Sequence, residues 1–110
     1  MNKQKSTAQT GKLPGEIRIW HACIKQHYLD LFTSGTSLKS RRIRNQARSF
    51  LIIPNHNLER ICNMLNYDYS YIFNKIKQIY YQVKNKKTSF EHSVINISRL
   101  LKSHHSRQKI

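Results

Sequence analysis

Two histidines and a cysteine, side-chain types that bind zinc, lie close together near the start of the chain as His21, Cys23 and His27. On a helix, residues 21 and 23 point about 200° apart, so they cannot bind one metal ion together. The chain has no Cys-x-x-Cys pair to complete a structural zinc site. His104 and His105 lie near the C-terminal end and are expected to be solvated. We therefore expect no metal site.

Carboxylates are too few and too scattered to suggest catalysis: Glu16, Asp30, Glu59, Asp68 and Glu91. No two of them can be argued into one site, which disfavours a nuclease. The chain has no glycine-rich phosphate-binding loop, and neither cysteine has the partners of a catalytic triad. The sequence predicts a protein that is not an enzyme and needs no cofactor.

Positive charge dominates the chain. Its 110 residues include 20 lysines and arginines against 5 acidic residues, a formal net charge of +15. Few of these cations can be paired internally, so a polyanion is the natural partner. Each contact with a nucleic-acid phosphate releases counterions, which favours binding. Membrane surfaces and acidic proteins are the other polyanions to consider, although no stretch approaches the roughly 20 apolar residues that span a bilayer.

Apolar residues recur at helical spacing along most of the chain, which predicts an all-α fold. Pro14 begins the first run and Gly35 ends it. A second run opens at Thr36 or Ser37, either of which can cap a helix, and Pro54 breaks the chain after it. No strand-like alternation and no internal repeat interrupts the pattern.

Three further helices are expected in the second half. A short one covers about 58–65. A longer one begins near Tyr69, after a turn that ends in the capping residue Asp68, and frays at the basic run 84–87. The last helix follows Thr88 and Glu91, which have the spacing of a capping box.

The length fits a single five-helix domain over residues 13–102, with a flexible basic arm at 1–12 and a basic tail at 103–110. Cys23 and Cys62 lie within apolar helical patterns, which suits reduced thiols in a cytosol-like compartment. A disulfide between them stays open at this point.

The third and fourth expected helices carry the pattern of a helix-turn-helix. Such a motif buries two apolar residues about four apart, follows the first with a small residue, and turns through a residue that tolerates positive φ. The corresponding residues are Ile61 and Leu65, then Cys62 as the small neighbour, Asn66 in the turn, Tyr67 as the apolar plug and Ile72 as the next anchor. The pattern departs at the second anchor, where Lys75 stands and the apolar residue is Ile76. An ordinary helical hairpin is the alternative.

On this interpretation, the recognition helix covers about 69–82 and its first turns enter the major groove of DNA. The side chains expected to read bases are Tyr69, Ser70, Asn74 and Lys77. Asn74 is the best candidate for adenine, because an amide donates and accepts together. Phe73, Tyr80 and Tyr81 are at least as well explained by packing.

DNA phosphates are expected to meet two groups of cations, Arg41, Arg42, Arg44 and Arg48 on the second helix and Lys84, Lys86 and Lys87 at the far end of the recognition helix. The arginines cannot all lie on one face, so two or three of them are expected to touch DNA. The lysines of the arm, Lys3, Lys5 and Lys12, could reach the minor groove or the backbone.

Two stretches, Ala47 to Leu51 and Leu58 to Ile72, resemble a pattern in small alphaproteobacterial and prophage proteins. There, an AR-x-F/W-L segment precedes an F-x-x-V-C-x-x-L/A-G-x-D-x-x-x-V segment, and the likeness extends to Trp20 and covers about half the chain. This chain has Leu58 for Phe and Asn66 for Gly. Similar small basic proteins of rickettsia-like bacteria are regarded as transcriptional regulators, so the resemblance implies a regulator with a helix-turn-helix.

The leading prediction is a transcriptional regulator that binds double-stranded DNA in the bacterial cytoplasm as a homodimer. Two-fold symmetry would double the contacts of one short recognition helix, through a dimer surface on the first or fifth helix. Two alternatives stay open. One is a nucleoid-type architectural protein that coats DNA with weak sequence preference. The other is a phage-derived adaptor whose basic face binds an acidic partner such as RNA polymerase.

Overall fold

The computed structural model describes residues 15–108, which form five α-helices and no strand, as the helical spacing predicts. The helices are α2 (Gly15–Asp30), α3 (Leu38–Leu51), α4 (His56–Leu65), α5 (Tyr69–Lys84) and α6 (Phe90–Gln108). The arm expected at 1–12, with Lys3, Lys5 and Lys12, and the helix start expected at Pro14 lie outside the described residues.

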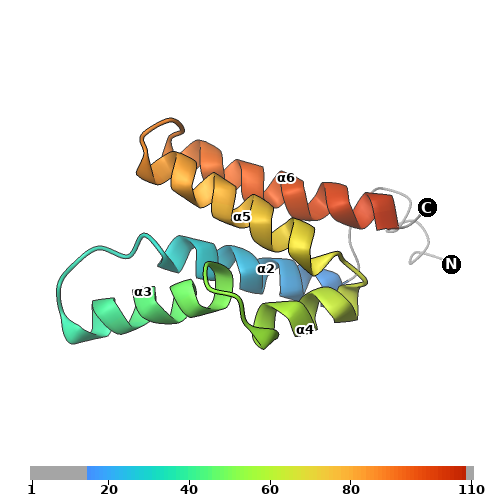
Figure 1. Ribbon diagram of the computed structural model, residues 1–110, viewed down its shortest axis with the longest axis horizontal. Coiled ribbons are helices and arrows are strands. Elements are labelled where there is room, and N and C mark those ends of the chain that lie inside the picture. The colour runs from blue at the N-terminus through green and yellow to red at the C-terminus, as the bar shows by residue number, and fades with distance from the viewer. Residues whose placement is uncertain (1–14, 109–110) are drawn as a thin grey trace, which may run out of the picture.

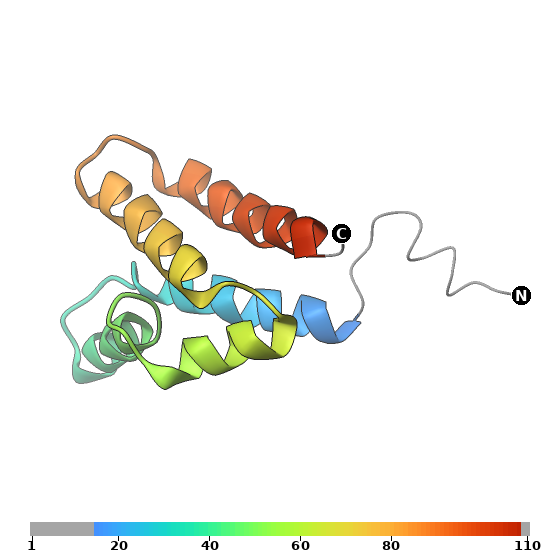
Figure 2. The ribbon, with the colours of Figure 1, turned by 45° about the vertical axis from the view of Figure 1, so that its right-hand side comes forward.

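The helices pack in layers around α2. Figure 1 shows α5 beside α6 on one side of α2, with α3 and α4 along the opposite side, and Figure 2 shows the same layers from a second direction. Contacts of α2 with α3 and α6, and of α5 with α3, α4 and α6, close the bundle. The most deeply buried core side chains are Ile24, Tyr28, Leu51, Leu58, Cys62, Ile72, Ile76, Ile97 and Leu101.

Side-chain caps fix where three of the helices begin. Of the two candidates before α3, Ser37 is the cap, and its Oγ accepts a hydrogen bond of 3.1 Å from the N–H of Ser40. The Asp68 carboxylate caps α5 as expected, accepting from the N–H of Tyr71 at 3.3 Å. Helix α4 begins two residues before the expected position, because Asn55 Oδ1 accepts from the N–H of Leu58 at 2.9 Å.

The first helix ends at Asp30 rather than near Gly35. Beyond it, Phe32 turns into the core, where its ring lies 4.8 Å from that of Phe90 and 5.5 Å from that of Tyr80. This contact joins the α2–α3 connection to α5 and α6. A continued helix would carry the chain away from these rings, so packing ends α2 before the glycine does.

The start of α6 differs from the expected capping box of Thr88 and Glu91. Ser89 is the residue whose Oγ accepts from the N–H of His92, at 3.1 Å. This register turns Ser93 inward, where its Oγ accepts a hydrogen bond of 2.7 Å from the Tyr28 hydroxyl and donates to the Phe90 carbonyl oxygen. The buried Tyr28 hydroxyl therefore has Ser93 as its hydrogen-bond partner only when α6 begins after Ser89.

A three-residue turn, Asn66 to Asp68, joins α4 to α5. Asn66 ends α4 in the left-handed region, with φ of 63° and ψ of 38°, which asparagine tolerates better than most residues. The N–H of Tyr67 then donates to the carbonyl oxygen of Cys62 at 2.7 Å. The chain thus passes at once into α5, which packs against α4.

Replacing Asn66 tests this turn. Asn66→Ala is expected to lower the free energy of unfolding by about 1 kcal/mol, because alanine lacks a side chain that compensates a left-handed backbone, whereas Asn66→Gly should be neutral or stabilising. Urea denaturation followed by circular dichroism measures both variants. Asn63→Ala, exposed within α4, is the matched control and should not destabilise the protein. Equal stability of the two Asn66 variants would contradict the role of the turn.

Candidate nucleic-acid interface

A cluster of aromatic rings holds the α4–α5 turn from two sides. This Tyr67 cluster consists of Tyr67, Tyr71, His21 from α2, and His104 and His105 from α6. Tyr67 is 4% exposed, and its hydroxyl shares a hydrogen bond of 2.8 Å with Nε2 of His21. The His104 ring meets the Tyr67 ring edge-on, and His104 Nε2 accepts a hydrogen bond of 3.1 Å from the N–H of Asp68. The start of α5 is therefore fixed to both α2 and α6.

Burial sets the charge of the His21–Tyr67 pair. Burial first, and then the nearby His105, Lys25 and Lys102, lower the pKa of His21 to about 4. Burial raises the pKa of Tyr67 to about 12, with a smaller contribution from Cys62. Both rings are thus uncharged near neutral pH.

His104 is the residue that sequence reasoning missed at this site. The sequence placed it in a solvated tail after Lys102, yet α6 continues to Gln108 and His104 is 5% exposed. Its contacts with Tyr67 and Tyr71 give the last turns of α6 something to pack against. The signal was present in the spacing, since His104 follows Ile97 and Leu101 at the seven- and three-residue steps of a helix face.

Three of the four expected base-reading residues lie along one side of α5. Ser70 and Asn74 are exposed and Lys77 is half-buried. Residues four and seven apart in a helix share a side, so these three form a stripe, which we call the α5 stripe. The opposite side of α5 holds the core residues Ile72 and Ile76. The stripe is therefore a polar surface on a helix anchored from behind.

Tyr69, the fourth expected base reader, lies on a different flank. It is half-buried, its ring stacks with that of Phe73 at 5.5 Å between centroids, and its hydroxyl accepts a hydrogen bond of 3.4 Å from the N–H of Asn55. Phe73 is 8% exposed, so it belongs to the core. This flank of α5 therefore reaches the α3–α4 connection.

Lysines of α5 lie over aromatic rings of the same helix. Nζ of Lys77 is 5.1 Å from the centre of the Phe73 ring, and Nζ of Lys84 is 5.9 Å from that of Tyr80. A ring face attracts an ammonium group and leaves its outer side in water. The rings therefore hold these charges close to the helix surface without neutralising them.

The four arginines of α3 do not share one face. Arg41, Arg44 and Arg48 are three and four residues apart and lie on one side, whereas Arg42 lies on another. Arg41 and Arg42 are exposed, and Arg48 is half-buried.

Arg44 has a contact within the chain that the sequence did not indicate. Its Nη1 donates hydrogen bonds to the carbonyl oxygens of Thr33, at 2.7 Å, and Gly35, at 2.8 Å. Gly35 has a φ of 107°, which favours glycine and orients this stretch of the α2–α3 connection. Arg44 therefore stabilises the connection, and only part of its guanidinium is left for an external anion.

Lys84, Lys86 and Lys87 are exposed around the C-terminal end of α5. Lys86 adopts a left-handed conformation with φ of 62°, and the N–H of Lys87 donates to the carbonyl oxygen of Gln82 at 2.8 Å. From Ser70 to Lys84 the helix rises about 21 Å. These lysines are thus well separated from the first turn of α5.

The lysines and arginines whose side chains the structure describes are not neutralised by acids of the chain. Within residues 15–105, the ion pair joins His56 Nδ1 and Glu59 Oε1 of α4 at 3.3 Å, and no lysine or arginine pairs with a carboxylate. Their charge is available to an external polyanion.

The described residues also include side chains of the types that bind metal ions, namely histidines, acidic residues and the thiols of two cysteines. No group of three histidine, cysteine or acidic side chains among them could hold a metal ion. Cys23 and Cys62 are both free thiols, and burial raises the pKa of each. No helix among residues 15–108 is long and apolar enough to cross a membrane.

Comparison with protein families, curated proteins and solved structures gives no match to this chain. The resemblance to small alphaproteobacterial and prophage proteins stays a prediction from the sequence.

The His21–Tyr67 pair predicts a pH dependence of stability. The unfolded chain binds a proton at His21 below about pH 6.5 whereas the folded chain binds it only near pH 4, so stability is present above pH 6.5 and falls as the pH drops toward 4. Across that interval, the wild type should lose about 3 kcal/mol more than His21→Gln, which cannot titrate. Urea denaturation at a series of pH values measures the difference. His92→Gln, at an exposed histidine, is the control and should follow the wild type. Parallel curves for wild type and His21→Gln would refute the assignment.

Proposed function

We propose that this chain is a DNA-binding transcriptional regulator in which α4 and α5 act as a helix-turn-helix and α5 is the recognition helix. The observation that carries the proposal is the α5 stripe of Ser70, Asn74 and Lys77. It is a row of accessible polar side chains on a helix whose first turn is fixed by a tight turn and a buried aromatic residue. A firmly packed helix with this polar stripe on its surface suits the major groove.

In this proposal, the α5 stripe reads base edges. The Asn74 amide makes a bidentate contact with adenine, donating to N7 and accepting from the N6 amino group. Ser70 and Lys77 contact neighbouring bases or phosphates. Tyr69 supports the recognition helix through Phe73 and Asn55 rather than reading a base. The proposed readout therefore depends on three residues spaced over two turns.

The phosphate contacts in this proposal come from cations of α3 and of the C-terminal end of α5. Arg41, Arg42 and Arg48 of α3 and the lysines Lys84, Lys86 and Lys87 supply them. Arg44 contributes less, because its guanidinium already serves two carbonyl oxygens of the α2–α3 connection. None of these cations has to break an internal ion pair in order to reach DNA.

A homodimer is part of the proposal, since one recognition helix reads few base pairs. Exposed apolar side chains on α2 and α6 support it: Ile19 is 66% exposed, Ile95 47% and Leu29 37%. Burying them against a second copy would remove apolar surface from water. The protein would act at the nucleoid, in the bacterial cytoplasm.

A nucleoid-type binder is the second candidate, and the spread of the cations favours it. They lie on two sides of α3 and at the far end of α5, an arrangement that can neutralise phosphates without a single docking register. Such a protein would bind unrelated duplexes about equally.

Fluorescence anisotropy with the upstream region of its own gene and a scrambled duplex, each at several salt concentrations, tests the two candidates. A preference of about a thousandfold near physiological salt would support the regulator. Equal binding that collapses as salt rises would support the architectural protein. Absence of binding even at low salt would overturn both and favour an acidic protein partner such as RNA polymerase.

Two substitutions separate base reading from phosphate binding. Asn74→Ala is expected to reduce the preference for the bound sequence by about 1–3 kcal/mol while leaving the salt dependence unchanged. Arg41→Ala should weaken all duplexes alike and lower the slope of log affinity against log salt by about 0.9. Gln26→Ala on α2 and Lys102→Ala on α6 are exposed controls away from α5 and should behave as wild type. Loss of affinity in the controls equal to that in Asn74→Ala and Arg41→Ala would contradict the proposed surface.

A further inference from the structure

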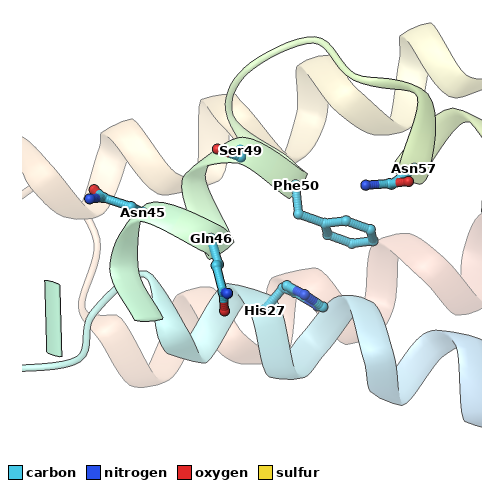
Figure 3. Close-up of a pocket in the computed structure, with 6 residues that line it drawn as sticks. All are labelled: His27, Asn45, Gln46, Ser49, Phe50 and Asn57. Carbon is cyan, nitrogen blue, oxygen red and sulfur yellow. The ribbon is translucent and has the colours of Figure 1, made fainter. Parts of the chain in front are cut away.

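An open depression of about 410 Å³ lies between α2, α3 and the first turn of α4. Figure 3 shows the residues that line it: His27, Asn45, Gln46, Ser49, Phe50 and Asn57. No lysine, arginine or acid is among them, although the chain carries a net charge of +15. A ligand in this neutral, polar hollow would need a chemistry different from that of a phosphate chain.

An aromatic pair forms one wall of the depression. The rings of His27 and Phe50 stack at 4.1 Å between centroids with an interplanar angle of 26°, and Figure 3 shows them beside each other, one from α2 and one from α3. Phe50 is 8% exposed and His27 is half-buried, so both rings are rigidly packed yet border the opening. Such a pair offers a planar ligand a surface on which to stack.

The hydrogen bond of His27 fixes its ring chemistry. Its Nδ1 lies 2.9 Å from the carbonyl oxygen of Cys23, and since a carbonyl only accepts, Nδ1 carries the proton and donates. In the neutral ring, Nε2 is then an acceptor. Among the described residues, Nε2 has no hydrogen-bond partner. The wall therefore presents an acceptor as well as a ring face.

Three amides and a hydroxyl supply the rest of the lining. Asn45, Gln46 and Ser49 from α3 and Asn57 from α4 are all exposed. Each amide carries donors and an acceptor in one plane, which is the pattern that pairs with the edge of a heterocyclic base. An apolar ligand would leave these groups desolvated without partners.

We propose that this depression binds a nucleobase, stacked against the His27–Phe50 pair and hydrogen-bonded through its edge to the amides of Gln46 and Asn57, which flank the two rings in Figure 3. Exposed cations border it. Arg42 lies one turn before Asn45 and Gln46 on α3, and Arg60 lies one turn after Asn57 on α4, where they can meet the phosphate of a nucleotide. The base can belong to a free nucleotide or to an unpaired position of a nucleic-acid strand.

This site does not depend on the proposed helix-turn-helix. None of its residues lies on α5, and a chain that fails to bind duplex DNA could still bind a base here. Conversely, loss of this site would leave the α5 stripe intact. The two proposals can therefore fail separately.

Side-chain amide signals in ¹H–¹⁵N NMR spectra of the full chain report directly on the site. Adenosine and cytidine are the probes for a free base, and ribose 5-phosphate is the control for the sugar and phosphate alone. We expect saturable shifts of the Gln46 and Asn57 side-chain signals with at least one nucleoside and none with ribose 5-phosphate. A short deoxyadenosine strand, compared with an abasic strand of the same length, distinguishes a strand base from a free one. Absence of saturable shifts with nucleosides and strand alike overturns the proposal.

A double variant, Gln46→Ala with Asn57→Ala, completes the test. Both positions are exposed within helices, so the fold should survive, and binding should weaken by about tenfold or more as the edge contacts are lost. Gln78→Ala, an exposed amide of α5 outside the depression, is the matched control and should bind as wild type. Unchanged affinity in the double variant, or equal shifts from ribose 5-phosphate, would place the contact elsewhere and refute the site.

Discussion

The ring of Tyr67 is buried while its hydroxyl needs a hydrogen-bond partner, and a small helical domain offers few positions that allow both. Its ring fills the junction between α4 and α5, and its hydroxyl is bound to His21 of α2 at 2.8 Å. His104 of α6 closes the other side and accepts from the backbone of Asp68, the residue that caps α5. The direction of α5, and with it the α5 stripe, thus follows from contacts made by helices at opposite ends of the chain. The uncharged state of the His21–Tyr67 pair is a condition of this arrangement, because a proton on His21 would lie near Lys25 and Lys102.

Within the described residues, the positive charge of the lysines and arginines is accommodated without salt bridges to carboxylates. A net charge of +15 disfavours compaction through self-repulsion, and the described residues hold no lysine or arginine ion pair that would relieve it. On α5, aromatic rings relieve part of this repulsion, because Lys77 lies over the ring of Phe73 and Lys84 over that of Tyr80. The same rings pack into the core on their inner sides. The charged surface of α5 and its buried face are therefore coupled through shared side chains, which suits a helix that must stay rigid while it binds a polyanion.

Much of the fold could be predicted from spacing and capping, because those signals are local. The five helices, the caps at Ser37 and Asp68 and the turn at Asn66 all follow from residues within a few positions of each other. What could not be predicted depends on partners distant in the sequence. Ser89 is preferred over Thr88 because Ser93 must meet Tyr28, and α6 continues past residue 102 because His104 meets Tyr67. At the candidate site, Ser70, Asn74 and Lys77 could be placed together from helical periodicity, whereas the withdrawal of Tyr69 to Asn55 and of Arg44 to the α2–α3 connection could not.

Helix α3 separates two kinds of surface chemistry. One side carries Arg41, Arg44 and Arg48, charged donors suited to phosphates. The side with Asn45, Gln46 and Ser49 carries neutral groups suited to the edge of a base, together with Arg42. Both sides rest on the same buried residues, Ala47 and Leu51, which pack into the core. Among the proposed contacts, a duplex on the α5 side and a nucleotide in the depression would share Arg42 alone. Any other influence of one on the other would have to pass through the position of α3, since α3 contacts α2 and α4 around the depression and also contacts α5.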